Sequence, residues 1–133
     1  MYGFEFDPGT GILRSKLRGH WSLAVAARYC EELGERIVEA RRSVGRLRLM
    51  VDATQHGSQT AEVIEYVFEH GGQAARLPSD RIAVCVTSLL GRHWAGRSRH
   101  EGATAGSRNM IFSSVASARA WLLDRGETLS SAA

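Results

Sequence analysis

The spacing of hydrophobic and polar positions changes several times along the chain, and each change predicts a new element. Two alternating segments, residues 4–7 and 12–18, are joined by Asp7-Pro8-Gly9-Thr10-Gly11, a run of strong turn formers. This arrangement predicts a β-hairpin over residues 4–18. In the second strand, Leu13, Ser15 and Leu17 share one side, and Ile12, Arg14, Lys16 and Arg18 share the other.

Helical spacing begins at Leu23, directly after Ser22, which is a good N-cap residue. The apolar arc of this helix comprises Leu23, Ala26, Ala27, Cys30, Leu33, Ile37, Ala40 and Val44. The opposite arc is charged and comprises Arg28, Glu31, Glu32, Glu35, Glu39 and Arg42. The pattern predicts an amphipathic helix that covers a sheet and ends near Gly45.

The middle of the chain predicts a strand, a polar loop and a second helix. Residues 47–53 alternate as a strand does, and residues 52–58 are polar enough to form the loop that follows. Thr60 is placed to cap a helix that runs to about His70, and Gly71-Gly72 is expected to end it.

The last third of the chain predicts two more strands and two more helices. Residues 81–87 form an almost continuous apolar run, which is typical of a strand buried on both faces and therefore central or near-central in its sheet. Ser88 is expected to cap a third helix, residues 109–112 to form a last short strand, and Ser114 to cap a C-terminal helix.

The resulting order, β-β-α-β-α-β-α-β-α, predicts one α/β domain over residues 1–126. We expect a mixed sheet of about five strands, parallel at its centre, with four helices and right-handed crossovers. Its 133 residues suit a single domain. Residues 127–133 are expected to form a disordered tail.

Composition adds location and redox state to this picture. No apolar run approaches the roughly 20 residues of a membrane-spanning helix, and the first residues lack the features of a secretory signal. The expected location is therefore the cytoplasm, where Cys30 and Cys85, both in apolar stretches, should remain unbridged. The net charge of +3 is only weak support for an anionic partner.

Three stretches resemble the SpoIIAA-like, STAS/SEC14-type small domains of bacteria. These are the hairpin at residues 4–13 with Gly19-His20-Trp21-Ser22, the strand at residues 48–53, and the region from the strand at residues 81–86 to Asn109-Met110-Ile111-Phe112 and residues 117–122. The resemblance spans roughly residues 4–124 and implies a SpoIIAA-like fold with a regulatory surface.

In anti-sigma-factor antagonists of that superfamily, a serine at the start of the helix after the central strand is phosphorylated. It follows an aspartate, and the pair lies about eight residues beyond the aspartate of the strand. Asp52 matches the strand aspartate, but Thr60 and Ala61 stand where the pair would be. The switch serine is therefore missing from this chain.

The loop after the central strand is the first candidate site, because α/β sheets bind ligands at the carboxyl ends of their strands. Its polar residues are Asp52, Thr54, His56, Ser58 and Thr60. Asp52, His56 and Ser58 are the residue types of a catalytic triad, yet they crowd into seven residues without a nucleophile elbow. A polar loop in which Asp52 binds loop amides is the simpler interpretation, so we expect no catalytic residues.

The expected third helix carries the second candidate site, a basic face that suits carboxylate or phosphate groups. It comprises Arg92, His93, Arg97, Arg99 and His100. A merely solvated face is the alternative. The spacing of the histidines predicts no metal site. The sequence contains no phosphate-binding loop motif, so we expect no cofactor, and it contains no nucleic-acid-binding motif.

Together these features favour a non-catalytic regulatory or protein-interaction module over an enzyme. A small-molecule or lipid-binding domain of the SEC14 type is the alternative, and would need a substantial apolar cavity beside the second and third helices. A hydrolase that uses residues 52–58 is the third hypothesis. A homodimer is also expected, because the first hairpin strand presents an edge, with Trp21 and Tyr29 extending the contact.

Overall fold

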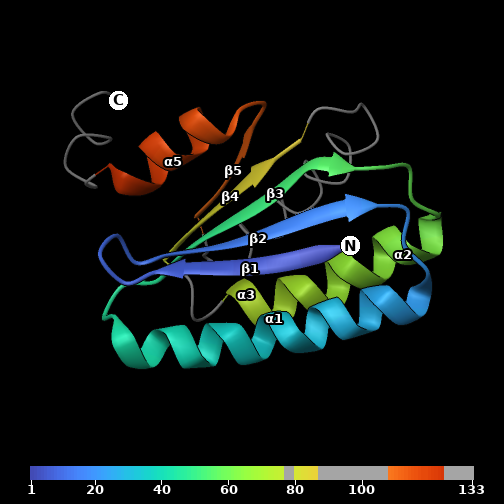
Figure 1. The fold of residues 1–133 in the computed structure, drawn as a ribbon, viewed down its shortest axis with the longest axis horizontal. Helices are drawn as coiled ribbons and strands as arrows, with labels where there is room; N and C mark the ends of the chain where they lie inside the picture. The colour runs from blue at the N-terminus through green and yellow to red at the C-terminus, as the bar shows by residue number, and fades with distance from the viewer. Residues whose placement is uncertain (77–79, 87–107, 125–133) are drawn as a thin grey trace.

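A five-stranded mixed sheet in the order β1-β2-β3-β4-β5 organises the protein (Figure 1). A computed structural model describes residues 1–76, 80–86 and 108–124. The antiparallel pair β1 (Tyr2–Asp7) and β2 (Ile12–Gly19) forms the predicted hairpin. The strands β3 (Arg48–His56), β4 (Arg81–Cys85) and β5 (Arg108–Phe112) follow, all parallel to β2. The predicted α/β class and mixed sheet are thus confirmed.

Helices cover both faces of this sheet (Figure 1). On one face lie α1 (Leu23–Ser43) and a second helical segment made of α2 (Ala61–Tyr66), the π-helical turn η1 (Val67–Gly71) and α3 (Gly72–Arg76). On the other face lies α5 (Val115–Leu123). The expected helix from Ser88, its basic face and the expected tail at residues 127–133 lie outside the described residues. No helix in the described ranges is both long enough and apolar enough to cross a membrane.

Three helices begin at the residues that the sequence predicts as N-caps. The side-chain oxygens of Ser22, Thr60 and Ser114 accept hydrogen bonds from the backbone N–H three residues further along, at 3.3, 3.2 and 3.0 Å. Each bond satisfies a donor that the first helical turn leaves without a partner.

Strand alternation divides the core into two clusters, one on each face of the sheet. The larger cluster packs Leu13, Leu17 and alternate side chains of β3 and β4 against α1 and the second helical segment. The smaller cluster packs α5 through Ala118 and Leu122 against the opposite face. The alternation predicted for β2 is confirmed, since Leu13 and Ile12 belong to different clusters.

The phase of α1 differs from the prediction at its first turns. Leu23, predicted on the buried arc, is 39% exposed, whereas Trp21 and Tyr29, predicted at a contact surface, are each 1% exposed. Both rings belong to the larger core cluster, where their centroids are 5.1 Å apart. The Tyr29 hydroxyl shares a 2.8 Å hydrogen bond with buried Ser15, which makes burial of both polar groups tolerable.

Gly71-Gly72 does not end the second helical segment, which continues to Arg76. Gly72 has φ −62° and ψ −44°, so the pair adopts helical rather than left-handed backbone. A Cβ atom at Gly71 would lie 3.6 Å from the sulfur of Cys30 on α1. This is an ordinary contact distance, so Gly71 lies inside the helical segment where that segment packs against α1.

The polar stretch after the third strand is also more regular than predicted. β3 continues to His56, because Gln55 and His56 pair with Arg18 and Gly19 of β2 beyond a register shift. Asp52, Thr54 and His56 therefore lie in a strand and not in a loop. The prediction for β4 is confirmed: it lies between β3 and β5 and is buried along its whole length.

The two cysteines lie on opposite faces of the sheet. Cys30 belongs to the larger core cluster and Cys85 to the smaller one, and both thiols are free. A disulfide needs Cβ atoms about 4 Å apart, which the intervening sheet prevents. Burial raises the pKa of each thiol to about 11, so neither is a thiolate at neutral pH.

Two glycine-to-alanine substitutions are expected to change stability in opposite directions. Gly34 lies in the interior of α1, where a Cβ would meet Ala74 at an ordinary 3.9 Å. Gly34→Ala should therefore raise the free energy of unfolding by about 0.5–1 kcal/mol. Gly19 has φ +78°, so Gly19→Ala should lower it by about 1–2 kcal/mol. Urea denaturation measures both, and stabilisation by Gly19→Ala would contradict this account.

Candidate functional site

The carboxyl ends of β2 and β3 lie side by side and form the candidate site. Gly19 pairs with His56 where the two strands end, and each strand then leads into a helix that begins within a few residues. We call residues 19–22 and 56–61 the rim. Loops at this end of a parallel sheet are where α/β proteins commonly bind ligands and partners.

The side chain of Gln59 ties the two loops of the rim together. Its amide nitrogen donates to the carbonyl oxygens of Gly19 at 2.7 Å and Gly57 at 2.8 Å, and its amide oxygen accepts from the Trp21 N–H at 2.9 Å. The Gly57 N–H also donates to the Gly19 carbonyl at 3.1 Å. The His20 ring shares a hydrogen bond with the Ser58 carbonyl. The rim is therefore held in one geometry by bonds between the loops.

Trp21 anchors the rim to the core beneath it. Its indole N–H donates to the Arg18 carbonyl at 2.9 Å, and its ring is almost entirely buried. The His56 ring packs on the indole with centroids 4.5 Å apart. An aromatic anchor of this kind makes the two loops part of the folded core.

Asp52 is buried on the face of the sheet that α5 partly covers. One carboxylate oxygen forms a 2.7 Å ion pair with the Arg14 guanidinium. The other oxygen accepts from the Thr54 hydroxyl at 2.6 Å and the Thr54 N–H at 3.1 Å. Asp52 is 2% exposed and the Arg14 side chain 30% exposed, so the pair lies at the border of core and solvent.

These contacts keep Asp52 ionised despite its burial. Burial alone would raise the pKa of Asp52, but the hydrogen bonds from Thr54 and Arg14 and the charge of Arg14 outweigh it, and the pKa is lowered. Its negative charge in turn adds to the effect of burial in raising the pKa of Cys85, the residue that pairs with it on β4. Asp52 is thus a structural anion whose oxygens are already in use.

His56 is held neutral. Burial, followed by the nearby charge of His20, lowers its pKa to about 4, and its Nε2 has no hydrogen-bond partner among the described residues. An unfolded histidine has a pKa of about 6.5. At a pH between the folded and unfolded pKa values of His56, the unfolded chain binds a proton at this residue that the folded chain does not bind. The free energy of unfolding therefore falls as the pH is lowered through this range.

We therefore expect the melting temperature to fall as the pH drops from about 6.5 to 4, and His56→Gln to weaken this dependence. His70→Gln is the matched control, because His70 is exposed and its described contacts, a ring stack and a hydrogen bond, are both with Tyr66. Thermal melts followed by circular dichroism at several pH values measure both. An equal pH dependence in wild type and His56→Gln would show that this imidazole is not responsible.

The remaining residues of the predicted loop are exposed. Ser58 and Thr60 are both exposed, and the Thr60 hydroxyl accepts the hydrogen bond that caps α2. Asp52 bonds Arg14 and Thr54, while His56 stacks on Trp21. The described contacts therefore do not link Asp52, His56 and Ser58 in the series of hydrogen bonds that a catalytic triad requires.

Sequence reasoning missed three residues that build the site, namely Arg14, Trp21 and Gln59. Strand alternation placed Arg14 on the correct side of β2, but only the pairing of β2 with β3 brings it to Asp52, 38 positions away. Gln59 lies between Ser58 and Thr60 of the first candidate site. Its role depends on Gly19 and Trp21, which lie 40 and 38 positions away.

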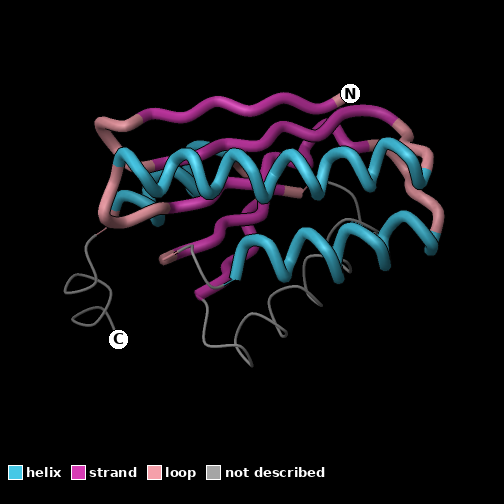
Figure 2. Tube along the Cα trace, turned by 90° about the horizontal axis from the view of Figure 1, so that it is seen from below, coloured by secondary structure: helices cyan, strands magenta, loops and turns pink. Residues whose placement is uncertain are grey.

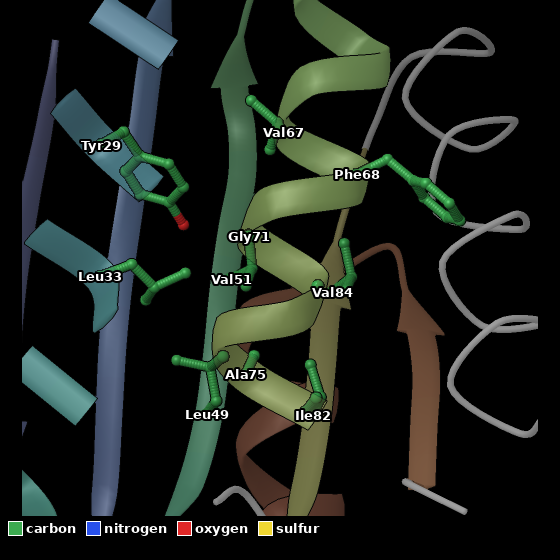
Figure 3. Close-up of a pocket in the computed structure, with 11 residues that line it drawn as sticks. Tyr29, Leu33, Leu49, Val51, Val67, Phe68, Gly71, Ala75, Ile82 and Val84 are labelled. Carbon is green, nitrogen blue, oxygen red and sulfur yellow. The ribbon is translucent and has the colours of Figure 1, made fainter. Parts of the chain in front are cut away.

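An apolar crevice lies under the second helical segment, against the larger core cluster (Figure 3). Tyr29 and Leu33 of α1 face Val67, Gly71 and Ala75 across it, above side chains of β3 and β4. Its volume is about 40 Å³. A cavity that holds benzene measures about 150 Å³, so the described walls leave no room for a lipid chain.

Among the described residues, no three histidine, cysteine, aspartate or glutamate side chains gather as metal ligands would. Neither a scan against protein families nor a search of curated proteins finds a match for this chain.

Proposed function

We propose that the protein is a non-catalytic regulatory module of the STAS/SpoIIAA-like type that binds a protein partner through the rim. The observation that carries this proposal is that polar side chains at the site form bonds to other parts of the protein and hold the site together. Gln59 cross-links the loops and Asp52 is neutralised by Arg14, so both serve the architecture. A preformed, rigid surface loses little conformational entropy when a partner binds.

The start of α2 supports the same proposal. Ala61 is the first residue of α2, follows the Thr60 cap and is exposed at the rim. In the superfamily that the sequence resembles, the switch serine occupies the start of the corresponding helix. Alanine at this position fits a partner surface that is not controlled by phosphorylation there.

The lipid-binding alternative would need a larger apolar cavity than the crevice that the described residues form. The basic face at Arg92, His93, Arg97, Arg99 and His100 stays a sequence prediction for an anionic contact. The interaction module is therefore the function that the described geometry favours.

The test is calorimetric titration of the full chain against the proteins encoded beside its gene. Ala61→Glu adds a charge to the rim while favouring the helix N-terminus, so it should preserve the fold and weaken partner binding at least about ten-fold. Ala116→Glu is the matched control, since Ala116 is exposed in the first turn of α5, away from the rim. An unchanged affinity for folded Ala61→Glu would contradict the assignment of the rim.

A further inference from the structure

No strand in the described parts of the chain pairs with the outer edge of β1. β1 is the first strand of the sheet order, and Figure 2 shows it as the outermost strand, at the top of the view. The Arg18 N–H donates to the Met1 carbonyl at 2.7 Å, so Met1 and Arg18 are a hydrogen-bonded pair of the hairpin. By alternation, Gly3, Glu5 and Asp7 also face β2, and the N–H and C=O groups of Tyr2, Phe4 and Phe6 point outward.

The side chains of those same three residues form a half-buried aromatic row on the α1 side of the sheet. Phe4 stacks on Tyr29 with centroids 5.8 Å apart, and the Arg36 guanidinium lies over the Phe4 ring, 5.5 Å from its centroid. Between this row and α1 runs a groove of about 100 Å³ whose walls include Phe4, Phe6, Arg36 and Glu39. The edge thus combines unused backbone groups with incompletely buried aromatic surface.

We propose that two copies of this chain pair through β1 in antiparallel orientation, around a two-fold axis that passes between the two Phe4 residues. The ten strands would then form one continuous sheet, with both α1 helices on the same face. This inference does not depend on the function proposed for the rim.

The backbone and the charges select this register among the alternatives. The outward groups of Tyr2, Phe4 and Phe6 require even-numbered residues to face even-numbered residues. The two strands can therefore shift relative to each other only by two residues at a time. With Phe4 on the axis, Tyr2 faces Phe6 of the partner subunit and Gly3 faces the partner's Glu5. One allowed step brings Glu5 directly opposite its own copy, which is destabilising. The opposite step brings Gly3 opposite its own copy, so that the two Lys16 side chains lie along one row with no carboxylate between them.

Charge complementarity supports the same register. Within one chain, Gly3 pairs with Lys16 and Glu5 pairs with Arg14. Across the dimer, one row of side chains therefore reads Lys16, Gly3, the partner's Glu5 and the partner's Arg14. Because Gly3 has no side chain, Lys16 can reach over it toward the partner's carboxylate. A basic residue thus flanks Glu5 on each side, one from each chain.

The first test is the mass of the full chain by sedimentation velocity at tens of micromolar protein. A mass of twice 14.6 kDa is expected, whereas a single-chain mass would overturn the proposal. Glu5→Lys places like charges along the row and should weaken the dimer at least about ten-fold. Glu31→Lys makes the same change of charge on the exposed side of α1 and should leave the mass unchanged. Equal effects of the two variants would also count against the interface.

The second test reads the register through two cysteine variants prepared separately. Gly3→Cys is sterically open, with no atom within 4 Å of the added Cβ, and Glu5 is exposed. Residues 3 and 5 would face each other in a non-hydrogen-bonded pair, with Cα atoms about 4.5 Å apart, close enough for a disulfide. Mild oxidation of a mixture should cross-link the two variants, while each variant alone should remain largely uncross-linked. Efficient cross-linking of one variant alone would show a different register.

Discussion

Replacing Leu33 by alanine is expected to lower the free energy of unfolding by about 2–5 kcal/mol. Leu33 is 2% exposed on the buried face of α1, and it lines the apolar crevice under the second helical segment. The substitution removes apolar contacts and enlarges a space that the neighbouring helices cannot fully close. Denaturation in urea, followed by circular dichroism, measures the change.

Glu35→Ala is the control for this prediction. Glu35 lies on the exposed side of the same helix, two residues away, and alanine is a good helix former. Its loss should change the free energy of unfolding by less than about 0.5 kcal/mol. Similar losses at the two positions would mean that the phase of α1 differs from the one described.

Asp52→Asn is expected to cost about 1–3 kcal/mol at neutral pH, because it leaves the Arg14 guanidinium beside a neutral amide at the edge of the core. The pKa of Asp52 is lowered in the folded protein relative to an unfolded value of about 4. Its contribution is therefore fully present above that unfolded value and is lost as the pH falls through the folded pKa. Asp52→Asn should accordingly weaken the loss of stability in acid.

Asp80→Asn provides a comparison with nearly the same ion-pair distance and a different burial. Asp80 pairs with Arg46 at 2.8 Å, but the two side chains are 32% and 53% exposed. Solvent screening limits such a surface pair to about 1 kcal/mol or less. Urea denaturation of both variants from pH 3 to pH 7 tests this difference. Equal destabilisation at pH 7 would contradict the structural role assigned to the buried carboxylate.

Much of the fold follows from local signals in the sequence. Ser22, Thr60 and Ser114 cap helices because a short hydroxyl side chain reaches the backbone N–H three residues further along, whatever surrounds it. The apolar run at Arg81–Cys85 predicts a strand covered on both faces, and strand alternation separates the two sides of β2. These signals depend on spacing along the chain, which the sequence displays directly.

The candidate site needed the tertiary structure, because its contacts join residues far apart in the chain. The Arg14–Asp52 ion pair and the bonds from Gln59 to Gly19 and Trp21 exist only because β2 and β3 pair in one register. The structure also departs from local preference at Gly71, a residue type that usually ends helices but that here lies inside a helical segment packed against Cys30 and Leu33 of α1. Composition and periodicity state which residues are buried or exposed. The register of the strands and the approach of the helices decide which of them meet.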